Sequence, residues 1–513
     1  AISQQVACRP LFAFTCELSM RRGSHALSCL AGFVVCACSS CWIGLWGLDR
    51  PFAVPRVHRS TKHAPRPIHA RFAVAGSAEV VEALAESPSE EEGRVFVSVA
   101  AFCDPELSAT LRSMLTQARR PELLFVGLVW QSFEDEDPLS REELADLSAL
   151  WGVKDGDAEV YENPVLTEIF EGGKLPLPAS PKYSCAELAG GHIRLLKIRA
   201  QDARGPCWAR YLAQHMWAGE DFYMQVDSHM RFVPQWDDEM RAQLAWCGRQ
   251  SEKPVLSTYG RNYPLGSPPD WDPPETYKTP GLICAGFFDS NGVLNIQSRP
   301  LKDKLENPRR NPFWSGHFSF SSSKVLKEVP YDPQCLMLLF GEEPLMAARL
   351  FTHGWDVYTP SEGLLFHLWD RDYRRTFFEM KQIYDELLPR TLRRVFWLLG
   401  SGPEPPASEQ QRGWPHPGRN AAEVESSDTF GLGTSRSLEE YERMADLSYH
   451  DRRIGDLALS AGFPDFDQFL VPEAAPPPPP DGAASAIFFV VCAPVVLGAL
   501  QLAWSAVQSA LPQ

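Results

Sequence analysis

The feature that most constrains the fold is a buried-type strand, a helix and a second buried-type strand in succession. VFVSVAAF (95–102) and LLFVGLVWQ (123–131) are apolar runs rich in β-branched residues, which is typical of strands covered on both faces. Asp104 is predicted to cap the helix between them, with Pro105 at its first position and Glu106 in its first turn. Because a strand–helix–strand unit pairs its strands in parallel with a right-handed crossover, the sequence predicts an α/β fold.

This alternation of strands and helices continues along the chain. Further strands are predicted at 192–200, 220–229, 253–259 and the end of 340–360, and helices at 205–217, the start of 340–360 and 437–459. Residues 260–312 are rich in proline, glycine and asparagine, so they are predicted to be a long functional loop. The expected architecture is a mixed, largely parallel sheet flanked by helices.

Composition changes along the chain predict its domain organisation. The predicted segments are an N-terminal tail (1–25), a transmembrane helix (26–48), a linker (49–93), the main domain (94–400), a Pro/Gly-rich insertion (401–420), a helical C-terminal part of that domain (421–470), a proline-rich linker (471–485) and a second transmembrane helix (486–507). A signal-peptide core for the first apolar stretch and a buried helix for the second are the alternatives.

The orientation of the chain in a membrane has two alternatives. The positive-inside rule favours a cytosolic main domain, because three basic residues precede the first apolar stretch and five follow it: Arg9, Arg21 and Arg22, then Arg50, Arg56, Arg59, Lys62 and Arg66. The opposite orientation has a short cytosolic N-terminus and a main domain in the lumen of the Golgi or ER. Both locations, cytosolic and Golgi or ER lumenal, stay open.

The net charge of the chain is −16, which argues against a nucleic-acid partner because phosphate backbones require a basic face. An acidic protein can still bind an anionic nucleotide, but it then needs local arginines and a cation.

Asp227-Ser-His229 ends a predicted strand, where α/β proteins place their chemistry. The Asp-x-His spacing puts a carboxylate and an imidazole on one side of an extended backbone, which suits a metal site. His367 follows another apolar strand and is the candidate third ligand, although a histidine flanked by Phe366 and Leu368 also fits a buried core position. His317 is open to the same two interpretations.

Further polar residues fit a nucleotide-diphosphate site or an ordinary structural role. Arg204 and Arg210 flank a predicted helix N-terminus that favours anions, but they also fit a solvated surface. Glu342 and Glu343 open a helix; they could grip sugar hydroxyls, or simply stabilise the helix N-terminus. The aromatic cluster Phe313, Trp314, Phe318 and Phe320 could be core or a platform for a sugar ring.

The order of these motifs resembles one enzyme family. VFVSVAAFCDPEL, VGLVWQ, ARGPCWARYLAQHMWAGEDFYMQVDSHMRFVPQWD, KPVLSTY, FWSGHFSFSSSKVLKEVPYDP, FGEEPLMAARLFTHGWDVYTPSEGLLFHLWDR and FGLGTSRSLEEYER together resemble the hydroxyproline polypeptide N-acetylglucosaminyltransferases, over residues 94–470. The chain is also similar to the mucin-type polypeptide N-acetylgalactosaminyltransferases. The resemblance implies a GT-A fold and a metal-dependent, retaining transfer of N-acetylglucosamine from UDP-GlcNAc to a protein hydroxyl, either hydroxyproline or Ser/Thr.

The resemblance also implies residue roles. Asp227, His229 and His367 would bind Mn²⁺ or Mg²⁺ together with the UDP-sugar diphosphate, and Arg210 would face that diphosphate. Arg204, Trp314 and Gly316 are further candidates for the donor site. Glu342 and Glu343 would act at the sugar and the reacting centre. Cys103 departs from the family, which is expected to carry an arginine or another polar residue there, in a region concerned with the base or the acceptor.

Two other functions compete with this one. A catalytically decayed, membrane-tethered scaffold or lectin would share the fold, but the joint presence of both glutamates and all three candidate ligands argues against decay. A metal-dependent nucleotidyltransferase would need a second carboxylate cluster or a phosphate-binding glycine-rich loop, and the sequence has neither motif.

Overall fold

The structure is a computed structural model that describes residues 93–134, 136–154, 159–160, 163–171, 182–403 and 429–463. The predicted N-terminal tail, both predicted membrane spans, the proline-rich linker and most of the other predicted linker segments lie outside these residues. Within the described ranges, no helix combines the length and apolarity needed to cross a bilayer.

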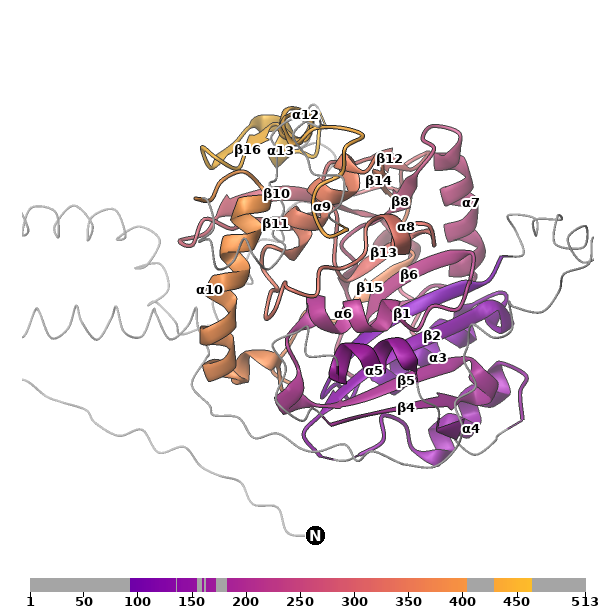
Figure 1. The fold of residues 1–513 in the computed structure, drawn as a ribbon. Coiled ribbons are helices and arrows are strands. Elements are labelled where there is room, and N and C mark those ends of the chain that lie inside the picture. Colours follow the sequence, from indigo (N-terminus) through magenta and orange to yellow (C-terminus); the bar gives the residue numbers. More distant parts are fainter. Residues whose placement is uncertain are drawn as a thin grey trace, which may run out of the picture.

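A ten-stranded sheet forms the centre of the protein (Figure 1). In spatial order its strands are β12 (Arg309–Arg310), β14 (Asp356–Thr359), β8 (Pro254–Leu256), β13 (Phe318–Ser322), β6 (Phe222–Asp227), β1 (Val95–Phe102), β2 (Leu124–Ser132), β5 (Ile193–Arg199), β4 (Tyr183–Leu188) and β3 (Glu159–Val160). All of them except β12, β13 and β4 run in one direction. The prediction of a mixed, largely parallel sheet is confirmed.

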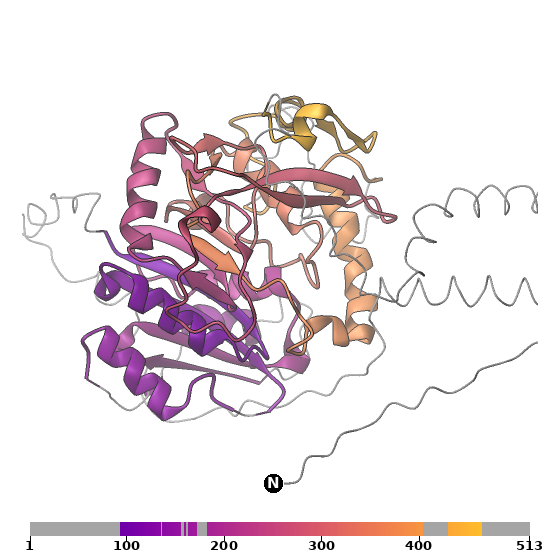
Figure 2. The ribbon, with the colours of Figure 1, turned by 180° about the vertical axis from the view of Figure 1, so that it is seen from behind.

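The alternation of side chains along β1 explains why helices cover both faces of the sheet. Phe96 points into one buried cluster, and Val95, Val97 and Val99 point into another. Helices α6 (Pro206–Gln214) and α9 (Glu342–Thr352) complete the first cluster, whereas α3 (Leu107–Gln117) and α7 (Trp236–Gly248) complete the second. Figure 1 shows α6 in front of the sheet, and Figure 2 shows the opposite side, where α3 lies in front. Burial of each large apolar side chain contributes about 1.5–3 kcal/mol.

The first cluster also receives α5 (Pro164–Glu171) and the C-terminal half of α10 (Lys381–Leu398). Helix α4 (Arg141–Leu150) packs beside α3 and begins with a capping box formed by Ser140 and Glu143.

The strand register brings several carboxyl ends to one edge of the sheet. Ala100 of β1 lies opposite Asp227 of β6, and Phe102 lies opposite Gln131 of β2. A three-stranded sheet adjoins this edge and consists of β7 (Met230–Phe232), β15 (Leu365–His367) and β9 (Arg261–Asn262). Because His367 pairs with Met230 across β15 and β7, the end of β15 lies next to the residues that follow β6.

Two predicted segments differ from the structure. The expected loop at 260–312 contains a hairpin of β10 (Gly281–Phe288) and β11 (Leu294–Pro300), turned at Asn291–Gly292, where Gly292 has a φ of +89°. The expected helix at 437–459 ends at Ala445, because Asp446 takes a left-handed conformation with a φ of +52°. It is followed by β16 (Leu447–Ser448), β17 (Arg453–Ile454) and the short α13 (Asp456–Leu459).

Candidate metal centre

Three side chains from two strand ends meet at the edge of the sheet. Asp227 is the last residue of β6, His229 follows it by two positions, and His367 is the last residue of β15. One potential ligand atom from each lies within 4.8 Å of the other two. Nε2 of His367 is 3.4 Å and Nε2 of His229 is 3.7 Å from Oδ2 of Asp227. Neighbouring ligands of an octahedral divalent cation are about 3 Å apart, so a small adjustment would let these three atoms hold one.

The protonation states of this group suit a cation. Burial lowers the pKa of His367 to about 4, so its imidazole is neutral near pH 7 and keeps a lone pair. Burial alone would raise the pKa of the Asp227 carboxyl, but the charge of Arg210 and the hydrogen bond with His367 outweigh it and hold that pKa well below its usual range. Within the described part of the chain, Nδ1 of His367 is buried without a hydrogen-bond partner. The residues present therefore fit a divalent cation.

Asp104 lies behind His229 and was not predicted to belong to this centre. Its Oδ2 accepts a hydrogen bond from Nδ1 of His229 at 2.7 Å and another from the Ser228 hydroxyl at 2.6 Å. Helix α3 begins at Leu107, later than predicted, but Oδ1 of Asp104 accepts a hydrogen bond from the Glu106 amide at 3.1 Å, so Asp104 caps the turn that leads into this helix. The position of Asp104 just after a buried strand was the signal that could have revealed it.

Asp227 and His229 line one side of an open pocket whose space, including the part open to solvent, is about 690 Å³. The ends of β1 and β2, the N-terminus of α6 and residues 371–378 form its walls, and its lining includes Phe102, Gln131, Arg371, Arg374, Phe377 and Phe378. Arg371 is exposed, and Nε of Arg374 lies 3.5 Å from Oδ2 of Asp104. These two arginines give the pocket a cationic wall that sequence reasoning did not assign, although Arg371 follows His367 by four residues.

Cys103, at the end of β1, is not among the residues that line this pocket. Burial raises the pKa of its thiol to about 12, so the thiol is neutral.

The two arginines that were predicted to face a diphosphate behave differently. Arg210 lines the pocket but is 5% exposed, and its terminal amino groups donate to Asp227 at 2.7 Å and to Glu342 at 2.5 Å. It therefore orients Asp227. Arg204 does not line the pocket, because its side chain turns back and donates to two nearby backbone carbonyls.

The two glutamates that open α9 lie in different environments. Glu342 is 3% exposed and accepts hydrogen bonds from Arg210 and from the Tyr331 hydroxyl at 2.5 Å. Glu343 is only half-buried; it accepts from the Gly316 amide at 2.9 Å and from the Tyr259 hydroxyl at 2.5 Å. Burial raises the pKa of Glu343 to about 7. Glu343 is thus a carboxyl that can change protonation near neutral pH.

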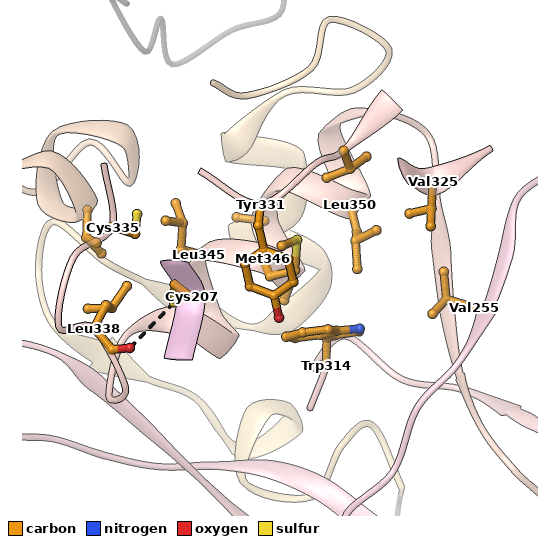
Figure 3. Close-up of a cluster of buried hydrophobic side chains, with 14 of the residues drawn as sticks. Cys207, Val255, Trp314, Val325, Tyr331, Cys335, Leu338, Leu345, Met346 and Leu350 are labelled. Atoms are coloured by element: carbon orange, nitrogen blue, oxygen red, sulfur yellow. Dashed lines mark hydrogen bonds between the residues drawn. The ribbon is translucent and has the colours of Figure 1, made fainter. Parts of the chain in front are cut away.

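Trp314 lies in the core and does not line the pocket, so the structure does not support its assignment to a donor site, which stays a prediction. It is 3% exposed, donates from Nε1 to the Ser319 hydroxyl at 3.1 Å and belongs to the apolar cluster that includes Tyr331 and Met346 (Figure 3). The exposed aromatic side chain beside the centre is Trp369, which is 40% exposed and has its ring centroid 4.2 Å from that of His367. Sequence reasoning did not single out Trp369.

Gly316 and His317 contribute packing to the centre. A Cβ at Gly316 would lie 3.1 Å from both Nη1 of Arg210 and Oε1 of Glu342, so the absence of a side chain permits the close approach of these groups. Nε2 of His317 accepts from the Gly260 amide and its Nδ1 contacts the Ser315 hydroxyl, each at 2.9 Å. Both ring nitrogens of His317 are therefore occupied, and it is not a ligand.

A family model matches most of the chain. The family model described as "Glycosyltransferase (GlcNAc)" matches residues 94–451. Among solved structures, the chain is similar to GalNAc-T7 crystallised with UDP, GalNAc and Mn²⁺, with a TM-score of 0.38 and 11% identity over 69% of this chain and 57% of that one. It is also similar to TarS of S. aureus, with a TM-score of 0.30 and 12% identity over 62% of this chain and 42% of that one. No curated protein matches the sequence.

Proposed function

The chain belongs to the GlcNAc glycosyltransferase family and is a UDP-sugar-dependent glycosyltransferase, and from that premise we propose that it transfers N-acetylglucosamine from UDP-GlcNAc to a protein hydroxyl. The observation that carries the proposal is the meeting of Asp227, His229 and His367 beside a pocket with two arginines.

A divalent cation is part of the proposal, with Asp227, His229 and His367 as its protein ligands. Bound there, a cation would neutralise the negative charge that develops on the departing diphosphate. One carboxylate with two imidazoles suits a transition metal such as Mn²⁺ better than Ca²⁺, which prefers oxygen ligands only. Mg²⁺ is the second choice.

The adjoining pocket is the proposed nucleotide site of a GT-A enzyme. It lies at the carboxyl ends of β1, β2 and β6, where open α/β sheets bind ligands. Arg371 and Arg374 present guanidinium groups that match phosphate oxygens, and Phe102, Phe377 and Phe378 supply apolar surface for a base. This arrangement supports binding of a nucleoside diphosphate without help from Arg204.

Glu343 is the proposed acid–base or sugar-binding carboxyl at the reacting centre. Its pKa of about 7 lets it hold a proton or accept one near physiological pH, and the Tyr259 hydroxyl and the Gly316 amide fix its orientation. The proposed outcome is retention of the α-configuration of the donor sugar, as the family resemblance implies.

The purified chain tests the donor and cation parts of this proposal. With UDP-GlcNAc and Mn²⁺ it should release UDP slowly even without an acceptor, and release should stop with excess chelator and resume when Mn²⁺ is restored. UDP-GalNAc and UDP-glucose serve as matched donors. UDP release that continues in chelator would contradict metal dependence, and absence of turnover under all conditions would favour the decayed scaffold.

The acceptor is proposed to be hydroxyproline or Ser/Thr in a protein. Matched peptides that carry hydroxyproline, proline, serine or alanine at one position would distinguish these, since the proline and alanine peptides lack the receiving oxygen. Mass spectrometry should find one added N-acetylhexosamine on a hydroxyl-bearing peptide only. Modification of the proline peptide would exclude hydroxyl transfer.

Membrane attachment is proposed only from the apolar segments 26–48 and 486–507, which lie outside the described residues. Protease protection of the main domain in sealed microsomes would locate it, because a lumenal domain is protected and a cytosolic one is cleaved.

A further inference from the structure

Asp104 is a buried carboxylate that the proposed reaction does not use. It follows β1 at the edge of the sheet, and its side chain is 0% exposed. Both oxygens are engaged: Oδ2 by His229 and Ser228, and Oδ1 by the backbone amide of Glu106 and the hydroxyl of Tyr373, each at 3.1 Å. A carboxylate held by four donors cannot rotate freely, so its direction toward His229 is fixed.

This contact determines which nitrogen of His229 carries the proton. A carboxylate only accepts hydrogen bonds, so Nδ1 of His229, at 2.7 Å from Oδ2, must be the protonated nitrogen. The lone pair of the neutral ring is then on Nε2. That nitrogen lies on the side of Asp227, 3.7 Å from its Oδ2, where the three candidate ligand atoms converge.

We propose that Asp104 is a positioning residue that holds His229 in the Nδ1–H tautomer and so presents its Nε2 lone pair to the cation. Carboxylate–histidine–metal arrangements act in this way on metal-binding histidines. The same carboxylate holds Tyr373, so it also links the ligand to the segment that forms the arginine-bearing wall of the pocket. The inference about the cation rests on the proposed function, whereas the inference about the tautomer does not.

Asp104→Asn separates these effects because it preserves size and replaces one oxygen with an amide nitrogen. The oxygen should stay at the Oδ1 position, since two donors, the Glu106 amide and the Tyr373 hydroxyl, point there. The amide nitrogen would then donate to Nδ1 of His229 and favour the Nε2–H tautomer. In that tautomer the lone pair is on Nδ1, so Nε2, which faces the metal site, has none to offer.

The experiment records ¹⁵N NMR spectra of histidine-labelled, metal-free protein at pH 8, with the His229 signal assigned by His229→Gln. We expect Nδ1–H in the wild-type protein and Nε2–H in Asp104→Asn, together with a loss of Mn²⁺ affinity of about 10–100-fold measured by the EPR signal of free Mn²⁺. A wild-type His229 in the Nε2–H form would overturn the proposal whether or not the variant folds. So would an unchanged tautomer in a folded variant.

Tyr373→Phe is the matched control, because it removes a hydrogen bond from the same carboxylate without contacting His229. This variant should keep the wild-type tautomer and Mn²⁺ affinity; a change of tautomer equal to that of Asp104→Asn would overturn the specific role of the Asp104–His229 contact. If wild-type protein has the expected tautomer but binds no Mn²⁺, the proposed metal-dependent function fails while the tautomer assignment stands.

Discussion

Two regions of the protein use their polar atoms differently. The first is the metal corner, which consists of Asp227, His229 and His367. The second is the buried layer below it, which consists of Arg210, Glu342, Tyr331 and Trp314. In the corner, ligand atoms from three side chains face one another beside an open pocket. In the buried layer, Arg210, Glu342 and Tyr331 satisfy one another with hydrogen bonds of 2.5 Å. Only the corner therefore has atoms left over for a ligand.

Because of this difference, variants in the metal corner should mainly lower activity and variants in the buried layer should mainly lower stability. Both regions nevertheless contain charged residues at strand or helix ends. Removal of one partner from a buried ion pair destabilises a protein by about 3–5 kcal/mol because the other charge is left uncompensated. Loss of His367 from the open corner leaves the contacts of Arg210 with Asp227 and Glu342 in place. Variants in the two regions should consequently fail in different assays.

Asp227→Ala should give the largest effect, a decrease in the rate of UDP release of more than about 100-fold. It removes a metal ligand itself, whereas loss of a residue that only hydrogen-bonds to a ligand costs about 10–100-fold. The fold should persist because Arg210 keeps its pair with Glu342. UDP release and circular dichroism measure the two properties. Full activity in a folded Asp227→Ala protein would remove the metal corner from the reaction.

Glu342→Gln should lower the free energy of unfolding by about 3 kcal/mol, the lower end for a broken buried pair, because Arg210 retains Asp227. Urea denaturation measures this change. If the variant is as stable as wild type but inactive, Glu342 contacts the substrate and the division between the two regions is wrong.

Glu343 should make folding stability depend on pH. Its pKa rises from 4.5 in the unfolded chain to about 7 in the folded protein, so the folded state binds more protons between these values. The free energy of unfolding should therefore decrease as the pH rises from about 4.5 to 7, by on the order of 2 kcal/mol after screening by solvent.

Glu343→Gln lacks this titration, so denaturation of both proteins at pH 5 and pH 8 isolates the contribution of this carboxyl. Identical pH dependence in the two proteins would show that Glu343 is not the titrating group. The same variant should also reduce UDP release by about 100-fold or more if the carboxyl acts as an acid or base.

Trp314→Phe should have the smallest effect, a loss of stability of about 1–2 kcal/mol from the missing ring and the lost hydrogen bond to Ser319. Affinity for UDP, measured by calorimetry, should not change. A large loss of UDP affinity at unchanged stability would instead place Trp314 at the donor.

Sequence periodicity was sufficient to predict the central strands and helices. β1, β2, β6 and α9 were predicted close to their observed bounds, because buried strands and capped helices have strong local signals. The β10–β11 hairpin was missed, since its Asn291–Gly292 turn lies in a segment whose proline and glycine content indicated a loop.

Within the site, the sequence identified residues whose position at a strand end is itself informative. Asp227, His229 and His367 belong to this class, and the structure brings them together; their role as ligands stays a prediction. Asp104 directly follows a buried strand and could have been identified from that position, whereas Arg374 approaches the site across the sheet edge, which sequence spacing does not reveal. The burial of Trp314 was not foreseen, because an aromatic run does not show which rings point inward.

The most direct test of the account compares Mn²⁺ binding by the wild-type protein and His367→Ala in the presence of UDP. His367 is the suitable position because its loss leaves both carboxylate contacts of Arg210 in place. We predict that wild type binds one Mn²⁺ and that His367→Ala, still folded, loses both this binding and UDP release. Equal Mn²⁺ affinity in the two proteins, or undiminished UDP release by His367→Ala, would contradict the proposed metal site.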